Sequence, residues 1–139
     1  MVGTQGYSCE EHKVKKAARC TKLPLCARFG EGSDHKVTTD DGYILSLQRI
    51  PKGISGKAAN KPPVLLQHGL LMDGITWLLN PPDQSLAFIL ADDGYDVWIT
   101  NTRGTKYSQG HTSLSRQDPA YWEWSWDELV DFDLPATLK

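Results

Sequence analysis

The chain has 139 residues, of which 40% are hydrophobic and 23% are charged, as is common for one globular domain. Its 15 Lys and Arg residues and 17 Asp and Glu residues leave a net charge of -2, so no overall positive field exists to attract nucleic acid or an anionic membrane. No stretch approaches the roughly 18 to 20 consecutive apolar residues that a transmembrane helix needs, and we predict none.

The first twelve residues, MVGTQGYSCEEH, lack the features of a secretory signal. Such a signal has a basic start, an apolar middle and a small-residue cleavage site. We therefore expect either a cytosolic chain or a sequence from which the natural N-terminus is missing, and the sequence leaves its localisation open.

All three cysteines, Cys9, Cys20 and Cys26, fall within the first 26 residues. No later cysteine could cross-link the rest of the chain. The five residues between Cys20 and Cys26 do not fit the close spacing of a zinc or redox pair, and His12 and His35 stand too far away to complete one. We predict neither a disulfide framework nor a metal site.

The tripeptide HKV occurs at residues 12–14 and again at 35–37, and the segment between the two copies is basic and lacks a hydrophobic period. Removing 23 residues would restore the continuous reading GYSCEEHKVTTDDGYILSLQRI. We therefore divide the chain into an N-terminal segment (1–12), a basic insertion that forms a loop or is disordered (13–35) and a domain (36–139). We expect the insertion to be dispensable to folding; the alternative is a basic peptide that binds an acidic partner.

Residues 36–50, KVTTDDGYILSLQRI, alternate apolar and polar residues on both sides of Asp41-Gly42. An Asp-Gly pair between alternating runs is typical of a hairpin turn. We predict two antiparallel strands with Gly42 at a positive φ, followed by a surface loop at residues 51–62.

Residues 64–100 show a strand, helix, strand pattern. The consecutive apolar residues of Val64–Gln67 predict a strand covered on both faces. Ser85 is placed to cap a helix that ends at Gly94, and residues 95–100 form the next strand. The expected buried face of the helix consists of Leu86, Ile89 and Leu90. A right-handed parallel crossover, and hence the α/β class, follows.

After residue 100 we expect a long polar loop, residues 101–121, that contains Arg103-Gly104 and His111. Ser125 and Glu128 have the spacing of a capping box and predict the start of a final helix, within which Pro135 falls.

The strand at residues 64–67 runs into His68-Gly69-Leu70-Leu71, which is apolar where a solvated loop would be expected. A turn of this kind can direct a backbone amide into a site. We expect Gly69 to allow a backbone geometry that a Cβ would forbid, and the two leucines to keep the site dry. The alternative is that Gly69 simply ends the strand and that the leucines pack in the core.

Three blocks, LQHGLLMDGITWLLN, SLAFILADDGYDVWITNTRGTKYSQGH and YWEWSWDELVDFDLPA, closely resemble the acid lipase family, which includes gastric and lysosomal acid lipases and their plant relatives. GYSCEEH and KVTTDDGYILSLQRI resemble the N-terminal segment of that family. The resemblance implies the N-terminal part of an α/β-hydrolase sheet, in which an antiparallel hairpin leads into parallel strands with a crossover helix. It further implies hydrolysis of carboxylic esters, such as acylglycerols or sterol esters, by a Ser-His-Asp triad without metal or cofactor, in proteins that are commonly secreted or lysosomal.

The same resemblance implies that the backbone N–H of Leu70 is an oxyanion donor and that His68 and Gly69 are structural members of its turn, because the family takes its catalytic histidine from far downstream. His111 is expected to be a loop residue. An aromatic set near the last helix either packs around the helix start, which we favour, or lines an acyl site; it comprises Tyr121, Trp122, Trp124 and Trp126.

The sequence contains no Gly-x-Ser-x-Gly nucleophile motif, and the nearest match, GISGK at Gly53–Lys57, lies in a loop. We interpret the chain as a truncated ester hydrolase without nucleophile, acid or base. A lipid ester is the expected substrate once the missing part is supplied. No nucleic acid partner is expected. Self-association through an unpaired strand edge is a further expectation. Two alternatives are a non-catalytic protein that binds a lipid or a partner, and an active esterase whose nucleophile is Ser55 or Ser108.

Overall fold

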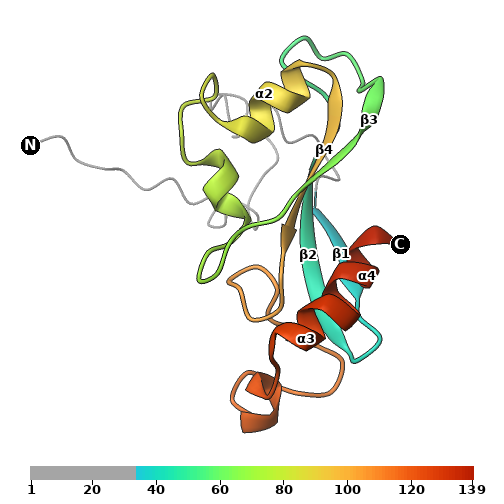
Figure 1. Ribbon diagram of the computed structural model, residues 1–139, viewed down its shortest axis with the longest axis vertical. Helices are drawn as coiled ribbons and strands as arrows, with labels where there is room; N and C mark the ends of the chain where they lie inside the picture. Colours follow the sequence, from blue (N-terminus) through green and yellow to red (C-terminus); the bar gives the residue numbers. More distant parts are fainter. Residues whose placement is uncertain (1–33) are drawn as a thin grey trace, which may run out of the picture.

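The computed structural model describes residues 34–139 (Figure 1). The predictions for the N-terminal segment, for the three cysteines and for nearly all of the basic insertion lie outside these residues. The last two residues assigned to the insertion, Asp34 and His35, are the first residues of a β-strand.

The predicted hairpin is confirmed. Strands β1 (Asp34–Thr38) and β2 (Tyr43–Ile50) are antiparallel, with Thr38 opposite Ile44. At the turn the N–H of Gly42 donates to the carbonyl of Thr39 at 2.9 Å, and Gly42 has a φ of +99°, as expected.

The remaining strands are β3 (Lys61–Leu66), β4 (Tyr95–Asn101) and β5 (Gly110–His111). The strand order is β1-β2-β4-β3, and β5 pairs with the beginning of β2. Strands β3 and β4 are parallel and are linked through helix α2 (Leu86–Asp92), whereas the other pairs are antiparallel. The α/β class and the hairpin leading into parallel strands are confirmed. Strand β3 begins at Lys61, three residues earlier than predicted, and ends at Leu66.

Two hydrophobic clusters lie on opposite faces of the sheet, because successive residues of a strand point to opposite sides. One cluster joins α2 and the 3₁₀ helix η3 (Gly74–Leu78) to the sheet; its buried members include Ile50, Leu66, Phe88, Val97 and Ile99. The other joins the 3₁₀ helix η4 (Pro119–Trp122) to β2; its buried members are Tyr43, Leu45, Leu47 and Tyr121.

The predicted buried face of α2 is only partly right. Leu90 is partly buried and packs against the first cluster, but the fully buried residues are Ala87, Phe88 and Ala91, and Leu86 and Ile89 are 42% and 45% exposed. In a helix of seven residues the period alone cannot select between two apolar faces, and the two small alanines let the backbone approach the sheet closely. Ser85 precedes the helix without capping it, since its hydroxyl donates to the carbonyl of Asn80 at 2.7 Å.

The final helix begins where predicted, with both hydrogen bonds of the Ser125–Glu128 capping box present. It runs through α3 (Trp126–Glu128), the π-helical turn η5 (Leu129–Asp133) and α4 (Leu134–Leu138). Pro135 has no N–H and would crowd the carbonyl four residues earlier, which explains why the preceding turn widens. None of the helices within residues 34–139 is long and apolar enough to cross a membrane.

The segment between β4 and the final helix is less irregular than predicted. It contains β5 and η4, so His111 is a strand residue opposite Tyr43 rather than a loop residue. A two-residue strand is too short to produce a recognisable alternation, which is why the sequence did not reveal it.

Replacing Gly42 by Val should lower the free energy of unfolding by at least about 1 kcal/mol. Its φ of +99° disfavours any side chain, and a Cβ would also lie 2.6 Å from the hydroxyl oxygen of Thr112. Gly56→Val is the matched control, because Gly56 has a φ of +73° but open space around it. Urea unfolding should show the larger loss for Gly42→Val; equal losses would mean that the contact with Thr112 costs nothing.

Candidate functional site

A groove of about 970 Å³ opens at the carboxyl ends of the parallel strands β3 and β4. Its walls are formed by residues 67–73 after β3, residues 102–106 after β4 and the segment from Trp122 to Thr137. Ligands of open α/β sheets bind at the carboxyl ends of the strands. The groove therefore lies where the fold would place a site.

A tight turn, residues 69–72, forms one wall of this groove. The N–H of Met72 donates to the carbonyl of Gly69 at 3.3 Å, and Leu71 has a φ of 57°. The third position of such a turn usually holds Gly or Asn, and a leucine there costs roughly 1–2 kcal/mol. Within residues 34–139 the backbone N–H groups of Leu70 and Leu71 have no hydrogen-bond acceptor. Both residues line the groove, so among the described residues the turn leaves two backbone donors without an acceptor at its wall.

Two physical expectations for this turn are wrong. Gly69 has no positive φ, and a Cβ there would meet no atom closer than the Met72 sulfur at 3.9 Å, so a side chain would be tolerated. Leu70 and Leu71 are 70% and 97% exposed, so they neither dry the site nor pack in the core. Leu71, not Gly69, carries the unusual backbone conformation.

His68 holds the beginning of the turn. Its Nδ1 lies 2.8 Å from the carbonyl of Gly69, and its Nε2 accepts from the backbone N–H of Thr102 at 3.2 Å. This pattern requires a neutral imidazole with its proton on Nδ1. Both ring nitrogens are engaged and the ring is buried, so His68 has no nitrogen free to act as a base.

Asn101 fixes the chain just after the turn, at Gly74. Its Oδ1 accepts from the N–H of Gly74 at 2.9 Å, and its Nδ2 donates to the carbonyl of Ser46 and to the side chain of Gln48. A Cβ on Gly74 would lie 2.6 Å from Ile99, so only glycine allows this approach. The sequence alone did not single out Asn101 or Gly74, although a polar Asn at the end of an apolar strand is a signal of such a role.

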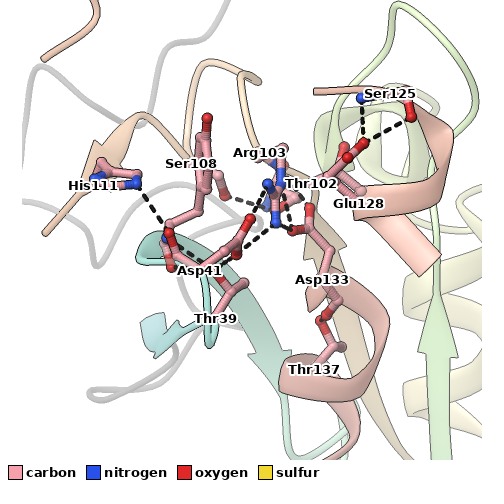
Figure 2. A network of polar contacts seen from close by, with 12 residues as sticks. Thr39, Asp41, Thr102, Arg103, Ser108, His111, Ser125, Glu128, Asp133 and Thr137 are labelled. Atoms are coloured by element: carbon pink, nitrogen blue, oxygen red, sulfur yellow. Dashed lines mark hydrogen bonds and ion pairs between the residues drawn. The ribbon is translucent and has the colours of Figure 1, made fainter. Parts of the chain in front are cut away.

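Beside the groove, the fully buried side chain of Arg103 joins two carboxylates (Figure 2). Its two terminal nitrogens donate to Asp41 at 2.6 and 3.0 Å. Its Nε donates to one oxygen of Asp133 at 2.8 Å, and its backbone N–H donates to the other at 2.9 Å. The guanidinium also lies 3.9 Å from the centre of the Tyr43 ring. One cation thus joins the hairpin turn, the end of β4 and the final helix.

The two carboxylates respond to this cation differently. Burial raises the pKa of Asp133 above its usual value, and the hydrogen bonds from Arg103 offset this only in part. Burial also acts to raise the pKa of Asp41, but the hydrogen bonds from Arg103 and Thr39 outweigh it and leave that pKa lowered. The difference follows from exposure, since the side chain of Asp133 is 4% exposed and that of Asp41 is 24% exposed.

The two serines considered as alternative nucleophiles have no histidine partner among the described residues. Ser108 is fully buried; its hydroxyl donates to the carbonyl of Asn101 at 2.7 Å and accepts from the N–H of Ser46 at 2.8 Å. Ser55 lies in an exposed loop and accepts only from the N–H of Lys57. Geometry assigns Ser108 a structural role and gives Ser55 no activating group.

His111 also has structural contacts. Its Nε2 lies 3.1 Å from the carbonyl of Asp41, and its Nδ1 accepts from the backbone N–H groups of Ser113 and Leu114 at 3.0 Å. Its ring meets that of Tyr43 edge-on. His111 thus links the loop after β5 to the hairpin turn through hydrogen bonds of its ring.

The four aromatic residues near the final helix fall into two groups, one in or against the core and one along the groove. Tyr121 is fully buried in the cluster on β2, and Trp124 packs against that cluster. Trp122 and Trp126 are 46% and 61% exposed and line the groove together with Trp124. Within residues 34–139, no group of three or more His, Cys, Asp or Glu side chains is placed to hold a metal ion.

Comparison with known proteins identifies the source of these features. A family model described as the partial α/β-hydrolase lipase region matches residues 26–81. Triacylglycerol lipase 2 of Arabidopsis thaliana is 55% identical over 107 residues, which cover 74% of this chain and 26% of that protein. Human Lipase member K is 51% identical over 137 residues, which cover 96% of this chain and 34% of that protein. The chain is a lipase-family α/β-hydrolase sequence.

This lipase-family chain spans about a quarter to a third of the length of these relatives. The predicted family and fold are therefore confirmed over the part that the chain covers. The mixed sheet, in which β3 pairs with β4 at one end of the strand order, is consistent with a partial α/β-hydrolase fold.

In the lipase-family chain, Arg103→Met should lower the free energy of unfolding by about 3–5 kcal/mol at pH 7, because it leaves Asp133 buried without a cation. The loss should shrink as the pH falls toward 4. Without Arg103 the burial of Asp133 is unopposed and its pKa rises further, so the folded variant binds a proton more tightly than the unfolded chain and gains stability on acidification.

Urea unfolding at several pH values measures the loss in free energy of unfolding and its dependence on pH. Arg49→Met is the matched control, because the Arg49–Asp96 pair lies at the surface and should contribute no more than about 1 kcal/mol. A similar small loss for both variants would mean that the Arg103 network does not hold the fold together.

Proposed function

We propose that the groove is one part of the active site of a carboxylic ester hydrolase acting on lipid esters. The observation that carries this proposal is that the backbone N–H of Leu70, a residue of the turn that lines the groove, has no hydrogen-bond acceptor within residues 34–139. The lipid class rests on the relatives, whose names include triacylglycerol lipase.

Ester hydrolysis places negative charge on the carbonyl oxygen when a nucleophile attacks. A backbone N–H held 2.7–3.1 Å from that oxygen stabilises the charge, and losing one such donor typically costs about 10²–10³ in rate. Because His68 and Asn101 fix both ends of the segment, the N–H of Leu70 is held before the reaction begins. This is what an oxyanion donor requires.

The wall of the groove opposite the turn has the apolar surface that binding of an acyl chain requires. Several of its side chains are large, apolar and partly exposed; they are Trp122, Trp126, Val130 and Leu134. A fatty acyl chain laid along them would cover apolar surface that is now in contact with water, at about 25 cal/mol per Å².

The alternative function is lipid binding without catalysis. It is favoured by one observation: within residues 34–139 no serine hydroxyl is hydrogen-bonded to a histidine that could activate it. The contact of Ser113 with His111 is a long one, at 3.4 Å, and the Nδ1 of that ring already accepts two backbone N–H groups.

The proposed donor can be tested by joining this chain to the remaining part of Arabidopsis triacylglycerol lipase 2 and measuring kcat on a triacylglycerol. Leu70→Pro removes the N–H at a turn position that proline tolerates, and we expect kcat to fall about 10²–10³-fold. Leu70→Ala keeps the N–H and should change kcat only a few-fold. Equal effects of the two substitutions would refute the assignment of Leu70.

The 139-residue chain alone should not hydrolyse a short-chain nitrophenyl ester and should not react with a serine-directed fluorophosphonate. A single oxyanion donor can polarise a carbonyl, but nothing among the described residues is placed to attack it. Turnover that disappears in Ser55→Ala or Ser108→Ala would show instead that the chain is a complete esterase with an unusual nucleophile.

A further inference from the structure

Strand β2 is connected to the turn that carries Leu70 through the side chain of Asn101. Asn101 is the last residue of β4, stands opposite Ser46 of β2 and is 1% exposed. Its Oδ1 accepts from the N–H of Gly74, a residue that follows the turn. Its Nδ2 donates to the carbonyl of Ser46 at 3.0 Å and to Oε1 of Gln48 at 2.7 Å. One buried amide thus links β2 to the chain after the turn.

The hydrogen-bond partners permit only one orientation of this amide. An N–H donates and a carbonyl accepts, so the oxygen of Asn101 must face Gly74 and its nitrogen must face Ser46. The backbone of Asn101 is held to the same strand, because the hydroxyl of Ser108 donates to its carbonyl at 2.7 Å and accepts from the N–H of Ser46 at 2.8 Å. Asn101 therefore cannot shift without breaking a buried hydrogen bond, which is costly.

Gly74 transmits this fixed position to the turn. A Cβ at Gly74 would lie 2.6 Å from Ile99 and 3.1 Å from Oδ1 of Asn101, so its backbone lies directly against β4. The preceding residue, Asp73, is extended, and its carboxylate accepts from the N–H of Ile75 at 3.0 Å. The turn at residues 69–72 is therefore joined to a fixed point by one extended residue.

We propose that Asn101 is a positioning residue for ester hydrolysis, which holds the Leu70 amide from β2 at the place where the ester carbonyl oxygen becomes negative. This inference rests on the proposed oxyanion role of Leu70. The side chain of Asn101 is buried and both of its polar atoms are engaged, so it acts on the substrate only through the turn. Because a displacement of about 1 Å can cost about 10²-fold in rate, holding the amide in place affects kcat.

Asn101→Asp separates positioning from general stabilisation. In this variant an ionised carboxylate can accept from Gly74 but cannot donate to Ser46 or Gln48, whereas a protonated carboxyl can do both, as the amide does. Burial beside two acceptor oxygens raises the pKa of the introduced carboxyl. The three residues that the Asn101 side chain binds carry no titratable group, and the nearest charged side chains in sequence, Arg103 and Asp73, bind other groups.

The test uses the chimera of this chain with the remaining part of Arabidopsis triacylglycerol lipase 2. The kcat and KM of each variant on a triacylglycerol are compared with those of the unsubstituted chimera from about pH 7 to about pH 5. At the upper pH we expect Asn101→Asp to lower kcat about 10–100-fold and to change KM less than about threefold. The loss should shrink as the pH falls, because protonation restores a donor to Ser46.

Two further variants serve as comparisons. Asn101→Leu can make neither hydrogen bond, so its kcat should remain low at every pH. Asn80→Asp makes the same chemical change at an exposed residue outside the groove and should match the unsubstituted chimera.

Hydrogen exchange of the 139-residue chain gives a measurement that is independent of activity. The amide of Gly74 should be protected in the unsubstituted chain and exchange faster in Asn101→Leu. The amide of Phe88, which donates to the carbonyl of Ser85 in α2, should exchange at the same rate in both and so shows that the variant is folded.

The outcomes separate this inference from the proposed function. If Leu70→Pro and Leu70→Ala differ as expected but both Asn101 variants keep the full kcat, the positioning role is refuted and the proposed function stands. Equal effects of the two Leu70 variants refute both. A loss in Asn101→Asp that does not shrink on acidification, or that lies in KM alone, also overturns the positioning role. If Asn101→Asp does not fold, the kcat of Asn101→Leu and the exchange of the Gly74 amide decide.

Discussion

The structure depends on one buried cation. Arg103 carries its charge in a place without solvent, and burying a charge is costly unless hydrogen bonds and opposite charges satisfy it. Asp41 and Asp133 satisfy it from the hairpin turn and from the final helix. Replacing all members of such a buried ionic network by apolar residues of similar volume is often harmless, whereas removing one partner alone is not. The network therefore fixes which segments meet more than it adds net stability.

The same stretch of chain also fixes the candidate site. Asn101 and Thr102, the two residues before Arg103, bind Gly74 and His68 at the two ends of the turn that presents Leu70. Three consecutive residues thus connect the turn after β3, the hairpin and the final helix. A strained and exposed turn can persist because its flanks are held by this rigid polar framework.

Local signals predicted the local structure. The Asp41-Gly42 turn, the strand, helix, strand order and the Ser125 capping box each depend on residues close in sequence, and each was found. The network of Arg103 could not be predicted in this way, because its partners lie 62 and 30 residues away. The buried face of α2 was predicted only in part, for Leu90 and not for Leu86 and Ile89, because both faces of this helix are apolar and only the shape of the sheet decides between them.

The groove and the edge of the sheet that is unpaired within residues 34–139 meet at β3. Its carboxyl end leads into the turn that carries the Leu70 amide, and its free side is where a further parallel strand would have to pair. Such a strand would end beside the turn and could deliver a nucleophile to a carbonyl held there.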